Sequence, residues 1–268
     1  SASDTSLIVT TYNWPEALSS VLKTVRGQRV LPGEVLVADD GSGPPTKQLL
    51  EQMQRDFPCP LIHIWHPDEG YQVARIRNRA ATAASGKYLI FIDGDCLLRP
   101  DFVERHIELR RQNHFVAGNR VLLTREFTDK VLKNSTDITT LSPFSIPRDS
   151  VNRRWSLMRL PLGWLRHTYP RRWKGVMTCN MALFSSDFMA TNGFEEHFEG
   201  WGYEDSDLAV RLHHLGIRRI SGRFAVTVLH LWHKSNKSSL EDSNWSRLQE
   251  TINSNRIRAV QGIQKDAV

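Results

Sequence analysis

The sequence predicts an α/β protein in which a single doubly wound, mostly parallel sheet carries helices on both faces. In the first half of the chain, short β-branched or aromatic stretches alternate with stretches whose apolar residues recur at helical spacing. Three of the strand-like stretches end in polar or acidic residues. In sheets of this class, ligands bind beyond the carboxyl ends of the strands, so these polar ends predict a binding site.

The expected elements follow one another as strand–helix–strand units. Strands are expected at 6–12, 34–39, 61–65, 87–93, 115–123 and 225–229. Helices are expected at 15–26, 46–56, 72–84, 101–113 and from the acidic run at 204–207 to about 215. Periodicity is weak over 124–174, and order returns at 176–185. The tail 239–268 is expected to form a polar helix, with Trp245, Leu248 and Ile252 at helical spacing.

The composition is that of an ordinary globular chain, with 268 residues of which 40% are hydrophobic. Cys59, Cys96 and Cys179 are odd in number and far apart, which argues against a disulfide framework and a structural zinc site. No stretch approaches the roughly 18 apolar residues of a spanning helix, and the first residues lack the features of a signal peptide. We therefore expect a protein of the reducing cytoplasm.

Positive charge is concentrated in one segment of the chain. The net charge is +6, yet 148–174 alone holds eight basic residues and one acid. Its partner is therefore expected to be anionic. Because tryptophans and leucines are mixed with the arginines, the segment suits peripheral contact with an anionic membrane at the inner face of the cell. A solvated, partly core-packed loop is the alternative, and no signature of specific nucleic-acid recognition is present.

Acidic residues at the strand ends predict a site for a cation and a nucleotide. Asp93 and Asp95 leave a strand on the same side, and Gly94 between them allows close approach of the backbone to a diphosphate. One carboxylate can hold a divalent cation while the other binds a ribose hydroxyl. At the end of an earlier strand, Asp39 or Asp40 can accept a hydrogen bond from the imide of a uracil ring. Simple acidic turns would also use these residue types.

Two histidines late in the chain are candidate ligands for the same cation. His230 and His233 lie three residues apart after a predicted strand, although Trp232 between them also fits simple packing. A carboxylate, an imidazole and diphosphate oxygens together suit octahedral Mn²⁺ or Mg²⁺.

A third candidate motif is the run from Trp201 to Asp207, which places three acids in the first turn of a helix. Favourable interaction with the helix N-terminus explains such acids in many proteins. The aromatic–Gly–aromatic run before Glu204 and Asp205 goes beyond capping. A carboxylate here can act as a general base while its neighbour binds a substrate hydroxyl.

Taken together, these motifs resemble the family 2 glycosyltransferases of the GT-A fold. The resemblance rests on seven segments in the family's order: TTYN, VADDGS, GYQVARIRNRAA, FIDGD, CNMALF, GWGYEDSDLAVRL and HLWH. It spans about 7–233 and is closest in pattern to the catalytic domains of bacterial chondroitin-type polymerases and of lipopolysaccharide or capsule glycosyltransferases. It implies an inverting enzyme that uses Mn²⁺ or Mg²⁺ to move a sugar from a UDP-sugar to a glycan or lipid-linked glycan in bacterial surface polysaccharide or lipopolysaccharide synthesis.

The resemblance implies one GT-A domain over 1–268. Residues 1–123 would bind the nucleotide sugar, 124–238 with the basic loop 148–174 would bind the acceptor, and 239–268 would form a helical extension on the acceptor side.

The resemblance also implies a role for each matching residue. The nucleotide-sugar site would comprise Thr10, Thr11, Tyr12, Asn13, Asp39, Asp40, Arg77, Asn78, Asp93 and Gly94. The metal would be held by Asp95 with His233 or His230, and His233 is favoured by similarity to animal β-1,4-galactosyltransferases. Asp205 would be the catalytic base with Glu204 beside it, and the acceptor site would be shaped by Trp201, Gly202 and Tyr203.

Two other functions fit part of the sequence. A nucleotidyltransferase acting on sugar phosphates also uses acids at the ends of a parallel sheet, and it would release pyrophosphate instead of UDP. A non-catalytic protein that binds anionic lipid or nucleic acid would use the basic segment, but it has no need of the acids and histidines.

Overall fold

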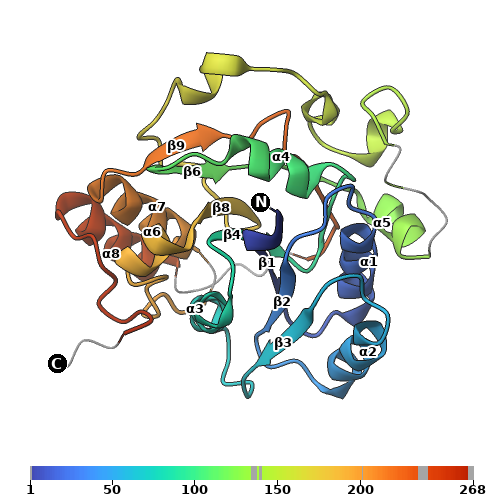
Figure 1. The fold of residues 1–268 in the computed structure, drawn as a ribbon, viewed down its shortest axis with the longest axis horizontal. Helices are drawn as coiled ribbons and strands as arrows, with labels where there is room; N and C mark the ends of the chain where they lie inside the picture. Colours follow the sequence, from blue (N-terminus) through green and yellow to red (C-terminus); the bar gives the residue numbers. More distant parts are fainter. Residues whose placement is uncertain (1, 134–137, 139–140, 201, 235–240, 265–268) are drawn as a thin grey trace.

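A seven-stranded sheet forms the centre of the computed structural model (Figure 1), which describes residues 2–133, 138, 141–200, 202–234 and 241–264. In sheet order its strands are β3 (Leu61–Trp65), β2 (Glu34–Asp39), β1 (Thr5–Thr11), β4 (Tyr88–Asp93), β8 (Asn180–Phe184), β6 (His114–Ala117) and β9 (Arg218–Ser221). All neighbouring pairs are parallel except those that β8 makes with β4 and β6. The predicted α/β class and the mostly parallel sheet are confirmed.

A second sheet of three strands lies beside the first and was not expected from the sequence. It consists of β5 (Cys96–Leu97), β10 (Val228–His230) and β7 (Arg120–Leu122). The predicted strand at 115–123 is wrong as a single element, because the chain leaves the main sheet after β6 and enters the small sheet at β7. At the crossing, a Cβ on Gly118 would lie 2.2 Å from the Asn180 side chain, so only glycine fits there.

Helices cover both faces of the main sheet, as predicted (Figure 1). The helices are α1 (Pro15–Arg26), α2 (Pro44–Gln54), α3 (Val73–Ala83), α4 (Phe102–Leu109), α5 (Arg125–Leu132), α6 (Ser185–Ala190), α7 (Glu204–His214) and α8 (Glu241–Asn253). One apolar core packs under α1, α4 and α5, and a second packs under α3, α6 and α7. Strands β1 and β2 are buried along their whole length, as a parallel sheet covered on both faces requires.

Segment 124–174 has more structure than its weak periodicity predicts. It contains α5, which begins after Thr124, and three short 3₁₀ helices at Arg148–Ser150, Arg154–Leu157 and Gly163–His167. In Figure 1 the yellow part of this segment, which includes the 3₁₀ helix Gly163–His167, lies beside β9. In the tail, α8 ends at Asn253, so the expected helix covers only part of 239–268. Within the described ranges, none of the helices combines the length and apolarity needed to cross a bilayer.

Candidate active site

Two cavities meet at the carboxyl ends of β1, β2 and β4. The first cavity, of about 490 Å³, is lined by residues that include Thr10, Thr11, Tyr12, Asp40, Asp93, Gly94, Asp95 and His233. The second cavity, of about 280 Å³, is lined by residues that include Thr178, Gly202, Tyr203, Glu204 and Asp205. Tyr71, Arg77 and Asp93 line both cavities and form the wall between them.

The Arg77 side chain joins the two cavities. It is buried, and its Nε donates to Thr10 Oγ1 at 3.0 Å. Its Nη2 donates to Asp93 Oδ1 at 2.9 Å, and its Nη1 donates to Glu204 Oε1 at 3.2 Å. Burial opposes the charged form, but Asp93 and Glu204 outweigh it, so the pKa of Arg77 is raised and the guanidinium remains a cation. Arg77 therefore fixes one carboxylate on each side of the shared wall.

The three residues predicted as metal ligands come together in the structure. Nε2 of His233 and Nε2 of His230 lie 3.3 Å and 3.5 Å from Asp95 Oδ2. Nδ1 of His230 donates to the Leu231 carbonyl at 2.8 Å, and Nδ1 of His233 donates to the Lys234 carbonyl at 3.1 Å. The ring nitrogen that each histidine turns toward Asp95 is therefore Nε2. Asp95, Cys96 and His230 form a group whose ligand atoms all lie within 4.8 Å of one another, and His233 joins this group through its contact with Asp95. Carboxylate and imidazole donors of this kind fit a divalent cation.

Asp95 lies largely buried beside this pair of histidines. Burial raises the pKa of its carboxyl, while His230 and His233 oppose that shift. Cys96 Sγ lies 3.6 Å from Asp95 Oδ1, but burial raises the pKa of this thiol well above its usual range. In this structure the Cys96 thiol is therefore a protonated neighbour of Asp95.

Asp205 lies at the beginning of α7, facing the second cavity. Its Oδ1 accepts a hydrogen bond from the Ser206 amide at 2.7 Å. Burial and the nearby Glu204 carboxylate raise the pKa of Asp205 to about 7, and Arg77 opposes the shift. A carboxyl with this pKa can take up a proton near neutral pH, which suits a general base. Glu204, in contrast, has its charge paired with Arg77.

The end of β2 supplies Asp40 to the first cavity. His66 Nε2 donates to Asp40 Oδ1 at 2.7 Å, and the Gln72 amide donates to Oδ2 at 3.0 Å. Burial raises the pKa of Asp40, while His66 and the Gln72 amide oppose the shift. On the rim, Tyr12 donates its hydroxyl to Asp68 Oδ2 at 2.9 Å and leaves its ring half exposed.

Three predicted nucleotide-site residues use their side chains inside the fold. Asp39 is fully buried, with Oδ1 accepting from the Ser42 amide and Oδ2 from His63. Asn78 exchanges hydrogen bonds with the Phe194 backbone. Asn13, in the left-handed region, accepts from the Gly43 amide. None of the three lines the first cavity.

Gly94 lines the first cavity and is also packed closely against the end of β1. A Cβ at this position would lie 3.0 Å from the Thr10 carbonyl oxygen and 3.1 Å from Thr11 Oγ1. The glycine is thus needed where β1 and β4 end side by side, and the Gly94 amide donates to the same carbonyl at 2.7 Å.

The aromatic–Gly–aromatic run takes an unusual backbone path before α7. Gly202 has φ +116° and Tyr203 has φ +74°, and the Tyr203 ring packs on Trp245 of α8 with ring centres 5.3 Å apart. This path turns Glu204 and Asp205 into the second cavity. Trp201, predicted to shape the acceptor site, lies outside the described residues.

Several residues of the two cavities were not identified from the sequence. They are Tyr71 in the shared wall, His66 and Asp68 around Asp40 and Tyr12, and Arg120 and Thr178 in the second cavity. The segment GYQVARIRNRAA contained a signal for Tyr71, because that residue lies six positions before Arg77 in the same motif. The others belong to turns and short strands that carry no motif.

Comparison with known proteins identifies the class to which this fold and site belong. A family model described as glycosyl transferase family 2 matches residues 6–166. A model described as the N-terminal domain of galactosyltransferase matches residues 164–234. Because the first match covers more than half of the chain, the chain belongs to glycosyl transferase family 2. The predicted family is therefore confirmed.

Related proteins match most of the length of this chain. The validoxylamine A glucosyltransferase of Streptomyces hygroscopicus subsp. limoneus is 30% identical over 251 residues, which cover 88% of this chain and 54% of that protein. The chondroitin synthase of Escherichia coli is 26% identical over 240 residues, covering 82% of this chain and 34% of that protein. The chain thus spans about half the length of the first of these relatives.

Solved structures confirm the GT-A fold. The mannosyltransferase PcManGT from Pyrobaculum calidifontis, in complex with GDP-Man and Mn²⁺, has a TM-score of 0.57 at 16% identity, covering 85% of this chain and 56% of that chain. S. aureus TarS in complex with UDP has a TM-score of 0.57 at 16% identity, covering 93% of this chain and 64% of that chain.

Proposed function

We propose that this chain is a metal-dependent, inverting glycosyltransferase that moves a sugar from a UDP-sugar to a hydroxyl of a glycan or lipid-linked glycan. The observation that carries the proposal is the wall shared by the two cavities. A carboxylate–histidine cluster lies on one side of Arg77, and a carboxyl with a pKa of about 7 lies on the other. A donor and an acceptor bound in the two cavities would meet at Asp93 and Tyr71.

The first cavity suits the nucleotide of the donor. Asp40 lies at its edge as an acceptor for the uracil imide, and the ring of Tyr12 is half exposed beside it. Asp93 has Oδ1 engaged by Arg77, so we assign Oδ2 to a ribose hydroxyl. UDP is the nucleotide in the TarS structure and GDP-Man the ligand in the mannosyltransferase, so the base itself remains part of the proposal.

We assign Asp95, His230 and His233 as the metal ligands. Imidazole nitrogen is a ligand that Mn²⁺ accepts more readily than Mg²⁺ does, so two histidines beside one carboxylate favour Mn²⁺. When bound, the metal would neutralise the charge that develops on the departing diphosphate. The residues themselves hold the ligand atoms in place through the carbonyls that accept from both Nδ1 atoms.

Asp205 acts as the base on the acceptor side. Its carboxylate takes the proton of the acceptor hydroxyl while the hydroxyl oxygen forms a bond to the anomeric carbon. The bond from that carbon to the diphosphate breaks on the opposite side, and UDP leaves with the electron pair. A single displacement of this kind inverts the anomeric configuration and needs no covalent intermediate with the protein. Glu204, fixed by Arg77, is placed to accept a hydrogen bond from a neighbouring hydroxyl of the acceptor.

The cellular role we propose is bacterial surface polysaccharide or lipopolysaccharide synthesis on the cytoplasmic side of the membrane. It is supported by the relation to bacterial transferases, including a chondroitin synthase. Peripheral contact of 148–174 with the inner face of the membrane is supported by two exposed aromatic side chains, Trp164 at 77% and Tyr169 at 65% exposure.

A panel of UDP-sugars with Mn²⁺ or Mg²⁺, scored by release of UDP and of pyrophosphate, tests the proposal. We expect UDP from one donor in the presence of metal, and Asp95→Ala should abolish that release. Asp129→Ala, which removes an exposed acid on α5, is the matched control. Pyrophosphate as the product would assign the chain to the nucleotidyltransferases, and unchanged turnover of Asp95→Ala would remove the metal assignment.

A further inference from the structure

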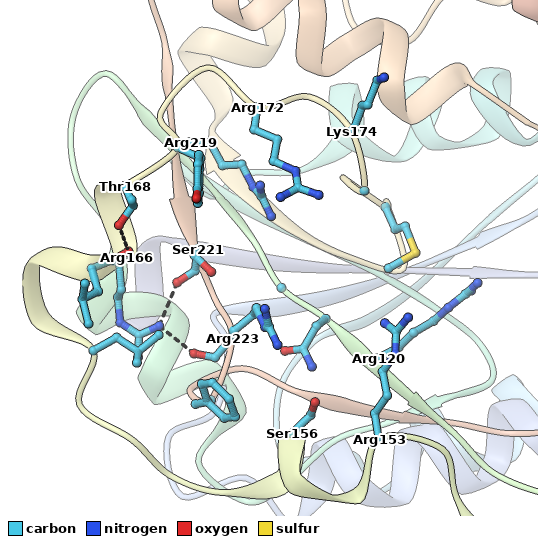
Figure 2. A pocket seen from close by; sticks show the side chains of 18 of the residues that line it. Arg120, Arg153, Ser156, Arg166, Thr168, Arg172, Lys174, Arg219, Ser221 and Arg223 are labelled. Atoms are coloured by element: carbon cyan, nitrogen blue, oxygen red, sulfur yellow. Dashed lines mark hydrogen bonds between the residues drawn. The ribbon is translucent and has the colours of Figure 1, made fainter.

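A cavity lined by arginines (Figure 2) lies next to the second cavity, with which it shares Arg120 and Met177. We call it the basic cavity. Its volume is about 750 Å³, and it lies between the basic segment, β7 and β9. Arg120, Arg153, Arg172, Arg219 and Arg223 line it, together with Arg166 and Lys174, and its lining contains no carboxylate.

The five arginines named first stand apart from the acids of the described chain. Among the residues that the structure describes, none of them forms an ion pair with a carboxylate. Figure 2 shows the side chains of Arg172, Arg219 and Arg223 turned toward the same space. Nε of Arg219 is buried without a hydrogen-bond partner, and burial together with the charges of Arg172 and Arg223 lowers the pKa of Arg219.

Arg166 differs from these five because its donors are already used. Its Nη1 donates to the carbonyls of Ser221 and Arg223, at 2.7 Å and 2.8 Å, and its Nη2 donates to the Leu160 carbonyl at 3.3 Å. Arg166 therefore braces the wall of the cavity (Figure 2). The remaining guanidinium groups keep donors that face the cavity and repel one another, which an anion would relieve.

The basic cavity borders the second cavity, where the proposed base lies. Arg120 and Met177 line both the basic cavity and the second cavity, where Asp205 lies. The basic cavity is therefore next to the position of an acceptor whose hydroxyl reaches Asp205. The donor cluster around Asp95 lines neither of these two spaces.

We propose that the basic cavity binds an oxyanion carried by the acceptor, a phosphoryl or carboxylate group on a sugar near the one that receives the transferred sugar. The proposal rests on the proposed glycosyltransferase function and adds the chemical class of the acceptor. Guanidinium groups suit both oxyanions because their paired N–H donors match two oxygens of a carboxylate or a phosphate.

The arrangement favours an acceptor over a membrane surface as the partner of these charges. Arg120, Arg219 and Arg223 come from outside 148–174, and they join the segment's own Arg153 and Arg172 around a concave space. A flat bilayer surface cannot enter such a space, whereas one or two sugar residues can.

Calorimetry with inorganic phosphate tests the cavity without any need for transferase activity. At low salt, with EDTA to keep the metal site empty, wild-type protein should bind phosphate. The double variant Arg172→Gln/Arg219→Gln should bind it about tenfold more weakly or worse, because charge-assisted hydrogen bonds are lost. Arg171→Gln is the matched control, since Arg171 is the exposed neighbour that does not line the cavity. Equal phosphate affinity in the double variant and the wild type would overturn the proposal.

Binding of UDP with Mn²⁺ separates failure of the cavity from failure of the proposed function. The double variant should bind UDP as the wild type does, which also reports that it is folded. A wild type that binds phosphate in the cavity but no UDP would refute the glycosyltransferase proposal and leave the anion site standing. A double variant that binds UDP normally and keeps its phosphate affinity would refute the anion site alone.

Acceptor panels identify the source of the anion. The panel contains phosphorylated, uronate-bearing and neutral oligosaccharides. We expect transfer to a hydroxyl of either the phosphorylated or the uronate-bearing oligosaccharides. For that acceptor, the double variant should have a KM about tenfold higher than the wild type, with little change in kcat. Transfer to neutral oligosaccharides with the same KM would contradict the proposal. Sedimentation with phosphatidylglycerol vesicles provides the other arm. If the double variant loses only vesicle binding, the charges serve a membrane and the proposal is wrong.

Discussion

Asp205 should give the transfer reaction a dependence on pH with a midpoint near 7. Burial and the charge of Glu204 raise its pKa to about 7, against the opposing effect of Arg77. Because the base works only as the carboxylate, activity should rise with pH. The ionised fraction is about nine tenths at pH 8 and about one tenth at pH 6. The value of kcat/KM, which reports the free enzyme, should therefore fall about tenfold when the pH is lowered from 8 to 6.

The assay is UDP release from the active donor at limiting acceptor, at constant ionic strength between pH 5 and 9. Asp205→Asn is the comparison variant, because it keeps the shape of the side chain and removes the base. We expect it to lose about 10²- to 10⁴-fold in transfer, the usual contribution of a general base, while its UDP binding by calorimetry stays close to that of the wild type. A flat profile from pH 6 to 8, or transfer retained in Asp205→Asn, would refute the assignment.

The same raised pKa has a consequence for stability. The folded-state pKa of Asp205 lies above its ordinary value of 3.8, so the folded protein binds this proton more tightly than the unfolded chain does. Its contribution to the free energy of unfolding is full below pH 4 and is lost as the pH rises toward 7. At pH 8, Asp205→Asn should therefore be more stable than the wild type by up to about 4 kcal/mol in urea unfolding. Equal stability of the two proteins at pH 8 would contradict the raised pKa.

Three further substitutions test other parts of the structure. His233→Ala should raise the Mn²⁺ concentration for half-maximal UDP release about tenfold or more, and an unchanged requirement would exclude this histidine as a ligand. Arg211→Met removes the 2.7 Å ion pair of the buried Asp207 carboxylate and leaves Arg256, at 3.9 Å, as its cationic partner. Urea unfolding should therefore show a loss of up to about 3–5 kcal/mol, and a loss below about 1 kcal/mol would argue against the pair. Gly202→Ala, at φ +116°, should lower the melting temperature more than Gly163→Ala, at φ +49°. Both positions have space for an added Cβ, so the difference comes from the backbone angle, which is farther from the left-handed helical region at Gly202. The reverse order would refute this reasoning.

The first half of the fold could be predicted closely because its signals are local. Helix α1 begins at Pro15 and ends at Arg26, as its periodicity and its proline indicate. Strands β2 and β3 have the predicted bounds. The short strands β5, β7 and β9 have two to four residues each, too few to show a period, and their positions are fixed by pairing with distant strands.

The site could be predicted where a motif marks a strand end, and less well where tertiary packing decides. Asp95 and His233 are 138 positions apart in the sequence, yet their side chains meet as the motifs predict. The burial of Asp39 and Asn78 could not be predicted, because their partners His63 and Phe194 lie in segments without a recognised motif. The basic cavity could be predicted only in part, since arginines from β7 and β9 complete it.

The small sheet connects the basic cavity to the proposed metal site, two regions that lie far apart in the sequence. Arg120, which borders the basic cavity, begins β7, and His230 of the metal cluster ends β10, the strand paired with it. In their parallel register Val121 lies opposite Leu229, midway between the two ends. Hydrogen–deuterium exchange of these central amides therefore offers one spectroscopic reporter on which metal loading and anion capture can both be followed.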